Sequence, residues 1–320
     1  MIIPLFISQY KKDISIVEKE LGKLKESQSK IVRQSTRHLF SSGGKRIRPI
    51  FGLLCAQFGN YDIHKIKYPA AVIELIHSAS LTHDDVIDDA EMRRGVSTIG
   101  FKWNNQVATF TGNYILAHSL LLLSKIDNPL AHKILANAIV EVCLGELDQI
   151  RDKYDFEQNL DNYLKRIERK TAILIAVAGQ LGAVAADVPE EMHQKLYEFG
   201  YNVGMSYQII DDILDFTATE KELGKPAGCD LLQGNITLPV LYAMENPELK
   251  ALIQTVHKDM LREELVPILD KIRQSDAIER AYKLSQEYLQ KALDILTELP
   301  KNKHRRNLVE IAKYLGKRKY

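Results

Sequence analysis

Two clusters of aspartates have the same form and could bind metal. Residues 84–88 read Asp-Asp-Val-Ile-Asp, and residues 211–215 read Asp-Asp-Ile-Leu-Asp. In each cluster the first and last carboxylates are four positions apart, so on a helix they share one face, about 6 Å apart along the axis. Carboxylates supply the oxygen ligands that Mg²⁺ prefers, and this ion usually adds waters and substrate phosphates. Two such rows of carboxylates, facing each other across a helix bundle, would hold several magnesium ions. The sequence therefore predicts an enzyme that binds a diphosphate through magnesium.

The alternative interpretation is that both clusters are exposed acidic faces of surface helices. A single Asp-Asp-x-x-Asp match is weak evidence for a metal site, so the neighbours must decide. The neighbours are largely apolar and give both helices broad apolar flanks: Leu81, Val86, Ile87, Ile209, Ile210, Ile213 and Leu214. This flanking predicts helices that are embedded in the fold rather than solvated.

Basic residues accompany the first acidic cluster on both sides. Residues 43–49 read Gly-Gly-Lys-Arg-Ile-Arg-Pro at an expected helix junction, where Lys45 and Arg48 can point at one anion. Arg93 and Arg94 follow the cluster at the expected end of its helix. Capping of the helix dipole is the alternative role for these two arginines.

Two further basic segments lie later in the chain. Residues 169–171 read Arg-Lys-Thr at the expected start of a long apolar helix, and residues 224–226 read Gly-Lys-Pro after the second cluster. Each segment alone would be unremarkable. Four basic and two acidic elements together predict that two polyanions bind near the metals.

The composition describes a globular protein with no feature of a nucleic-acid or membrane protein. The chain has 320 residues, 45% of them hydrophobic and 27% charged, with a formal net charge of +1. The apolar start, residues 1–6, is too short for a signal peptide. The longest nearly uncharged run, residues 171–186, falls short of a membrane span and predicts a buried helix. Three dispersed cysteines suit a reducing compartment, so we expect a cytoplasmic protein without a membrane anchor.

Apolar residues recur at helical spacing through most of the chain, and no long strand-like alternation occurs. Glycine and proline mark helix breaks near residues 43–49, 127–129, 187–189 and 246–247. No linker or low-complexity segment divides the sequence. We therefore expect an all-α fold, a large helical bundle around a central active-site cavity, formed by residues 1–320 as a single domain.

The chain resembles the trans-polyprenyl diphosphate synthases. The resemblance runs from about residue 30 to the end, and five segments carry it: residues 43–49, 81–89, 93–95, 170–171 and 204–215. The resemblance implies the isoprenoid synthase type of helical fold. It also implies a chain-elongating prenyltransferase that condenses isopentenyl diphosphate with an allylic diphosphate, here farnesyl diphosphate.

The resemblance implies a role for each candidate residue. Magnesium, about three ions, would be held by Asp84, Asp88 and Asp211. The catalytic set would comprise Asp84, Asp85, Asp88, Asp211, Asp212, Asp215, Lys170 and Lys225. Arg93, Lys170, Thr171, Gln208 and Lys225 match positions around the allylic substrate, and Lys45, Arg48, His77 and Arg94 match the isopentenyl diphosphate pocket. A hydrogen-bonded core histidine is the alternative for His77.

Small residues before the first acidic cluster bear on product length. Ala79 and Ser80 come five and four positions before Asp84, where short-chain family members carry aromatic side chains. Small side chains there leave a product tunnel open at least to Ile76 on the same expected helix. A medium-to-long product follows.

The finer pattern is similar to the large, catalytic subunit of two-component heptaprenyl diphosphate synthases. Residues 224–228, 230–239 and the ending 314–320 carry this similarity. It implies all-trans heptaprenyl diphosphate as the product, for a menaquinone side chain, and a small non-catalytic partner subunit. Family members also pair as homodimers, and an amphiphilic product implies transient contact with a membrane surface.

Three other interpretations remain open. A single-component polyprenyl or geranylgeranyl diphosphate synthase fits the small residues, although Asn235 stands where such enzymes usually carry lysine. A non-catalytic regulatory subunit that binds prenyl diphosphates is disfavoured because all six aspartates of the two clusters are present. A terpene cyclase would lack the second Asp-Asp-x-x-Asp cluster and the basic pocket.

Overall fold

The computed structural model describes residues 8–41, 43–93, 95–219 and 227–316. These residues are almost all helical, apart from one short two-stranded ribbon, which confirms the expected all-α class. The chain divides into two compact units. Unit 1 comprises Met1–Ile139 and Leu174–Tyr197, and unit 2 comprises Val140–Ile173 and Glu198–Tyr320.

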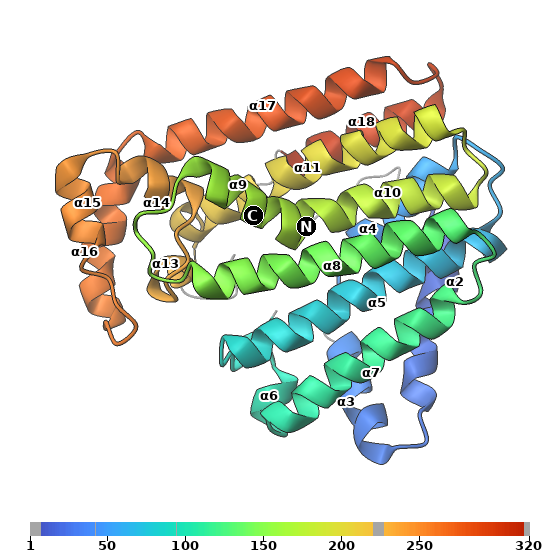
Figure 1. Ribbon diagram of the computed structural model, residues 1–320, viewed down its shortest axis with the longest axis horizontal. Coiled ribbons are helices and arrows are strands. Elements are labelled where there is room, and N and C mark those ends of the chain that lie inside the picture. The colour runs from blue at the N-terminus through green and yellow to red at the C-terminus, as the bar shows by residue number, and fades with distance from the viewer. Residues whose placement is uncertain (1–7, 42, 94, 220–226, 317–320) are drawn as a thin grey trace. The chain divides into compact units, whose positions relative to one another are not determined.

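Unit 1 is built around the long helix α5, which carries the first acidic cluster. Its elements are the helices α2 (Lys11–Gly22), η1 (Lys23–Glu26), α3 (Lys30–Ser41), α4 (Ile47–Ala56), α5 (Ile63–Ile87), α6 (Ile99–Lys102) and α7 (Asn105–Leu123), and the strands β1 (Met92–Arg93) and β2 (Val96–Ser97). Helices α5 and α7 lie side by side along their lengths (Figure 1). Asp62 begins α5 by accepting a hydrogen bond from the His64 backbone, a typical N-cap.

The predicted buried helix is α10 (Ile173–Ala185), and almost all of it lies in unit 1. Its side chains are buried on every face, as an apolar helix without a polar stripe requires. Glycine permits its close approach to α4, because a Cβ on Gly182 would lie 2.1 Å from the Gly52 carbonyl oxygen. Helix α11 (Glu190–Thr217) begins in unit 1 and continues into unit 2, as does α8 (Pro129–Arg151).

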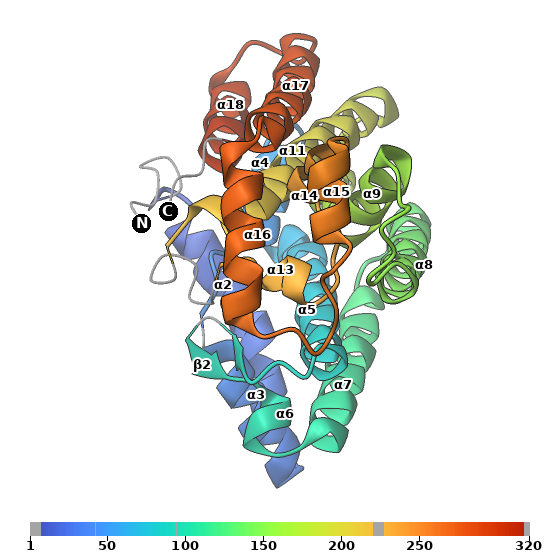
Figure 2. The same ribbon diagram turned by 90° about the vertical axis from the view of Figure 1, so that its left-hand side faces the viewer.

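Unit 2 carries the second acidic cluster near the end of α11. Its other elements are α9 (Leu160–Ile167), the π-helical segment η2 (Glu168–Ala172), α13 (Cys229–Leu232), α14 (Leu238–Ala243), α15 (Pro247–Ile253), α16 (Arg262–Gln274), α17 (Ala277–Thr297) and α18 (Lys303–Gly316). Helices α17 and α18 pack side by side (Figure 1), and α14, α15 and α16 gather at one end of this unit (Figure 2). One buried apolar cluster joins α9 to α11 and a second joins α13 to α16.

The predicted helix breaks are confirmed at all four places. Helix α4 follows the glycine pair, α8 begins at Pro129, α11 follows residues 187–189, and Asn246 caps α15, which begins at Pro247. Within the described ranges, no helix combines the length and the apolar character that crossing a membrane requires.

Candidate active site

The first acidic cluster occupies the last turn of α5. Asp84 and Asp85 are 6% and 7% exposed, and Asp88 is the C-cap residue, whose backbone N–H donates to the Asp84 carbonyl at 2.9 Å. Asp84 and Asp88 therefore lie one turn apart, as the spacing predicted. The Oδ1 atom of Asp84 is buried and accepts no hydrogen bond from the part of the chain that the structure describes. A buried carboxylate oxygen without a donor fits a site for a cation.

The apolar flanks of this cluster are less complete than expected. Leu81 and Val86 are half-buried, but Ile87 is 45% exposed. The reason is that α5 ends at Ile87, so the last side chain leaves the packed face of the helix. The aspartates are nevertheless buried, which excludes a solvated acidic face for Asp84 and Asp85.

Arg93 does not lie at the end of α5, contrary to expectation. It belongs to a two-stranded antiparallel ribbon in which Met92 pairs with Ser97 and Gly95 turns with φ 75°. From this ribbon the Arg93 Nε donates to Asp85 Oδ1. The arginine therefore returns to the acidic cluster as a charge partner rather than a dipole cap. Arg94 lies outside the described residues.

Burial raises the pKa of Asp85, and the carboxylates of Asp84 and Asp88 raise it further. The Arg93 guanidinium acts in the opposite direction, because it stabilises the ionised carboxylate. A neighbouring cation thus favours the ionised form of Asp85. Arg93 supplies one such charge within unit 1.

A small cavity of about 40 Å³ joins the first acidic cluster to the glycine-rich segment. Residues from α3, the segment before α4, α5 and the ribbon line it, among them Gly43, Arg46, His77, Asp85 and Arg93. His77 therefore shares a cavity with the acidic cluster, as the binding hypothesis requires. Lys45 is exposed and Arg48 is half-buried at the start of α4, beside this lining.

Two histidines of α5 differ in their surroundings. Unlike His77, His83 lies against Gly112 of α7, where a Cβ on the glycine would approach the ring within 2.4 Å. Its Nε2 is 3.4 Å from the Thr109 carbonyl oxygen. These contacts agree with a packing role for His83.

The residues expected to set product length precede the acidic turn on α5. Ile76 and Ala79 are 4% and 2% exposed, and Ser80 is half-buried with its hydroxyl donating to the His77 carbonyl at 3.0 Å. They lie one to two turns before Asp84. Their role in a product tunnel stays a prediction.

The second acidic cluster lies in the last turns of α11. Asp212 and Asp215 are 3% and 1% exposed, while Asp211 is half-buried. Asp215 accepts the backbone N–H of Asp230 at 3.2 Å. The deep apolar flanks predicted here are confirmed, because Ile209, Ile210, Ile213 and Leu214 are all buried.

Both oxygens of Asp212 are occupied by protein donors. Tyr163 of α9 donates its hydroxyl to Oδ2 at 2.7 Å, and the Gln208 amide donates to Oδ1 at 2.8 Å. Gln208 in turn accepts the Thr171 hydroxyl at 2.6 Å. This series of hydrogen bonds, which begins at Tyr163, orients Gln208 and Thr171. Tyr163 was not among the residues predicted from the sequence.

Burial raises the pKa of Asp212 to about 7, and the negative charge of Asp230 adds to the rise. Hydrogen bonds from Gln208 and Tyr163 limit it, because they stabilise the ionised form. The pKa of Tyr163 is raised well above its usual range, first by burial and then by Asp212. Tyr163 therefore remains a hydrogen-bond donor at every ordinary pH.

Lys170 and Thr171 lie on a π-helical turn rather than at the start of α10. The backbone N–H of Ile173 reaches the Glu168 carbonyl, five residues back. Gly204 of α11 permits this turn to lie close to it, because a Cβ at that position would be 2.5 Å from the Ala172 Cα atom. Single π-helical turns are frequent at functional sites.

The basic residues of this turn divide into two roles. Arg169 is committed to the acidic side chains of α8, with Nη1 2.6 Å from Asp148 and Nε 2.8 Å from Glu141. Lys170 donates to Gln149 and lies 3.8 Å from Glu146, and it is more exposed than Arg169. Lys170 is thus less strongly paired than Arg169, and Lys225 lies outside the described residues.

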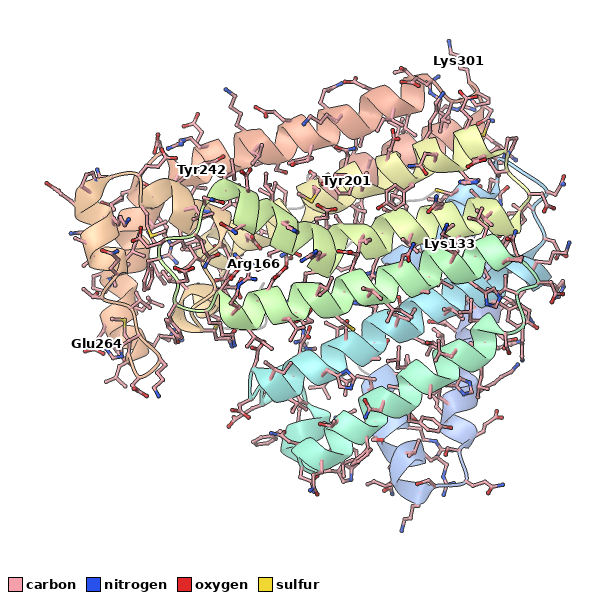
Figure 3. All side chains as sticks on the ribbon, viewed as in Figure 1. Lys133, Arg166, Tyr201, Tyr242, Glu264 and Lys301 are labelled. Atoms are coloured by element: carbon pink, nitrogen blue, oxygen red, sulfur yellow. The ribbon has the colours of Figure 1, made fainter. Side chains whose placement is uncertain are left out.

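Arg166 anchors α9, the helix that carries Tyr163 (Figure 3). Arg166 is 6% exposed, and its guanidinium donates to the Gln158 side chain and to the Ile236 backbone oxygen. Asp152 lies 3.7 Å away as a charge partner. These contacts join α9 to the segment that precedes α14 and limit where the Tyr163 hydroxyl can lie.

No three acidic, histidine or cysteine side chains converge tightly enough within the described ranges to hold a metal by themselves. Mg²⁺ does not require such a group when waters and phosphate oxygens complete its coordination. The carboxylates of Asp84 and Asp88 in unit 1, and of Asp211 in unit 2, fit that mode of binding. That the two acidic rows face each other stays a prediction.

Comparisons with known proteins agree with this chemistry. The family model described as polyprenyl synthetase matches residues 29–271. The chain is 56% identical over 308 residues to heptaprenyl diphosphate synthase component 2 of Bacillus subtilis, covering 96% of this chain and 88% of that protein. It is 53% identical to the same component from Geobacillus stearothermophilus, covering 96% of each.

Solved structures give the same result for the fold. Heptaprenyl diphosphate synthase from Staphylococcus aureus matches with a TM-score of 0.92 and 43% identity, covering 96% of this chain and 98% of that one. A polyprenyl synthase from Caulobacter crescentus, complexed with calcium and isoprenyl diphosphate, matches with a TM-score of 0.93 and 29% identity. That match covers 98% of this chain and 97% of the other.

Proposed function

The chain belongs to the polyprenyl synthetase family, and we propose that it is the catalytic subunit of a heptaprenyl diphosphate synthase. In this proposal residues 1–320 act as one catalytic domain in the cytoplasm. The observation that carries it is the buried turn of Asp84 and Asp85, with one carboxylate oxygen lacking a donor among the described residues and Arg93 paired to its neighbour.

The proposed reaction joins isopentenyl diphosphate to an allylic diphosphate such as farnesyl diphosphate. The allylic carbon–oxygen bond breaks and releases pyrophosphate, and the double bond of isopentenyl diphosphate attacks the resulting carbocation. A new carbon–carbon bond forms, and the pyrophosphate takes the proton that is then lost. Repeated additions give all-trans heptaprenyl diphosphate, which would supply a menaquinone side chain.

Magnesium, when bound, neutralises charge on the departing diphosphate. Asp84, Asp88 and Asp211 are the residues that would hold it, as about three ions shared with the substrate. Asp85 and Asp212 are paired with protein donors, so they act by orienting their neighbours. Asp215 accepts the backbone N–H of Asp230, so it acts by holding the second acidic cluster in place.

The two substrates would be recognised by different basic groups. Arg93, Lys170 and Lys225 would bind the allylic diphosphate. Lys45, Arg48, His77 and Arg94 would bind isopentenyl diphosphate; the cavity shared by His77 and Asp85 supports this assignment. The N-terminus of α4 adds backbone donors suited to a phosphate beside Lys45 and Arg48.

The carbocation would be stabilised by dipoles rather than by a base. The Gln208 side chain and the Thr171 hydroxyl are held in one orientation by the hydrogen bonds that begin at Tyr163. Fixed dipoles stabilise developing charge without reorganising during the reaction. The π-helical turn would present carbonyl oxygens of Lys170 and Thr171 in the same way.

We also propose that the chain acts with a small partner subunit, because the relatives from B. subtilis and G. stearothermophilus are named as component 2. Helix α8 offers a surface for it in unit 2. Val140, Leu144, Leu147 and Ile150 are 37% to 62% exposed and follow one another at helical spacing. A continuous exposed apolar stripe is typical of a protein interface.

The proposal is tested by replacing Asp84 with asparagine, using Asp89 as the matched control. Asp89→Asn changes an exposed neighbour with positive φ, a conformation that asparagine tolerates. With Mg²⁺, the partner and both substrates, Asp84→Asn should lose about 100-fold or more in kcat, and Asp89→Asn should retain activity. Full activity in Asp84→Asn would overturn the proposed site.

A further inference from the structure

We propose that Arg46 and Glu74 form a positioning pair for the isopentenyl diphosphate site, which rests on the proposed function. Arg46 stands between Lys45 and Arg48 but does not act as a third phosphate ligand. Its guanidinium pairs with Glu74 on α5 and thereby sets the backbone that presents the other two cations. Arg46 is therefore a positioning residue for substrate affinity.

The backbone of Arg46 is in the left-handed region, with φ 49° and ψ 36°. This conformation is unfavourable for a residue that carries a Cβ, because the Cβ crowds the backbone. Such conformations persist only where the surroundings impose them, and they gather at binding sites. Arg46 also begins α4, because its carbonyl accepts the Ile50 N–H at 3.0 Å. Its conformation consequently sets the direction in which α4 and Arg48 leave the glycine-rich segment.

The side chain of Arg46 is held from α5 and α2. Its Nη1 donates to Glu74 Oε1 at 3.0 Å, and its Nε lies 3.4 Å from Glu18 Oε1. The Arg46 and Glu74 side chains are only 12% and 7% exposed, whereas Glu18 is 52% exposed. Glu74 is therefore the principal partner, and a pair this well shielded fixes geometry more than it adds stability.

Glu74 connects this pair to the rest of the pocket. It precedes His77 by about one turn on α5, and Arg46, Glu74 and His77 line the same small cavity. The pair thus joins the segment that carries Lys45 and Arg48 to the helix that carries His77. Lys45, Arg48 and His77 would all contact one diphosphate, so a fixed distance between the glycine-rich segment and α5 favours its binding.

A purely structural ion pair is the competing explanation, and unit 1 contains a matched example. Glu20 is 4% exposed and binds Lys67 of α5 at 2.8 Å and Lys23 at 2.6 Å. Of these residues Lys67 lies on the same long helix as Glu74, and none of the three lines the cavity. Removal of Lys67 therefore measures what loss of one shielded ion pair between α2 and α5 does by itself.

The experiment uses Arg46→Gly, which removes the guanidinium but favours the same left-handed backbone. Glu74→Gln is the second variant, and it keeps the shape of the side chain. Both should raise KM for isopentenyl diphosphate about 10-fold, while KM for farnesyl diphosphate and kcat change less than about two-fold. Arg46→Lys should recover part of the affinity because it restores a donor.

Lys67→Met is the control and should leave both KM values unchanged, whatever it does to the melting temperature. The inference is wrong if wild-type protein with its partner is active and Arg46→Gly and Glu74→Gln keep the wild-type KM. It is also wrong if both KM values rise together, because that pattern indicates general loosening. An inactive wild-type complex would instead overturn the proposed function on which the inference rests.

Discussion

The hydroxyl of Tyr163 donates to Asp212 at 2.7 Å, and both side chains are almost completely buried. The phenol lies on α9 and the carboxylate on α11, so this bond joins two helices of unit 2. The Gln208 amide donates to Asp212, and Gln208 accepts the hydroxyl of Thr171 on the π-helical turn, so the position of Asp212 fixes both side chains. Tyr163 therefore orients Gln208 and Thr171, although it has no proposed role in the reaction itself.

Tyr163→Phe should lower the free energy of unfolding by about 1–3 kcal/mol, because it leaves a buried carboxylate oxygen without its donor. The same change should raise the pKa of Asp212, since the Tyr163 hydrogen bond lowers it. Urea unfolding measures the stability. Tyr282→Phe, at a 46% exposed position, should change stability by less than about 0.5 kcal/mol. Equal effects in the two variants would contradict this account.

The stability of the metal-free protein should depend on pH through Asp212. Its pKa is raised from 3.8 to about 7 in the folded state, so folding favours the protonated form. This contribution to stability is complete below the unfolded pKa and is lost as pH rises through the folded pKa. Asp212→Asn cannot ionise, so the wild type should lose stability relative to it between about pH 4 and pH 7. Parallel stability curves for the two proteins would contradict the raised pKa.

Ser80→Phe should shorten the product. The larger side chain would fill space one turn before Asp84 on α5, where a growing chain is expected to pass. Chromatography of the dephosphorylated products measures the length distribution. Ser80→Thr adds a single carbon and should have a smaller effect than phenylalanine. An unchanged distribution of product lengths in Ser80→Phe would contradict the assignment of the product tunnel to this part of α5.

Leu147→Asp should weaken association with the partner subunit. A charge placed in a buried apolar interface costs several kcal/mol, so the dissociation constant should rise at least about 100-fold. Val266→Asp is the control, because Val266 is 43% exposed on α16, away from the stripe. Sedimentation of the mixed subunits measures both. Normal association of Leu147→Asp would exclude α8 as the interface.

The all-α fold and its breaks could be predicted because proline, glycine and apolar spacing act locally. Pro129 and Pro247 each begin a helix where the sequence placed a boundary. The burial of Asp84, Asp85 and Asp212 also followed from their apolar neighbours. These features depend on residues within one or two turns of one another.

The rest of the site depends on contacts between residues far apart in the sequence, which local sequence patterns do not predict. Arg93 was expected at a helix end because nothing in its spacing distinguishes a two-residue strand from a frayed turn. The π-helical turn at Lys170 depends on contacts with distant residues such as Gly204. Tyr163 was missed because its partner is 49 positions away and its ring is apolar, like any core residue. The role of Arg46 could not be predicted from its motif, because its partner Glu74 is 28 positions away.

The central claim is that this chain carries the catalytic groups of a two-component heptaprenyl diphosphate synthase. The most direct test is product analysis with Mg²⁺, farnesyl diphosphate and labelled isopentenyl diphosphate, using the purified chain alone and then with the small subunit from the same cell. The account predicts little product from the chain alone and heptaprenyl diphosphate from the mixture. A defined long product from the chain alone would contradict the two-component claim, and no product from either would contradict the catalytic assignment.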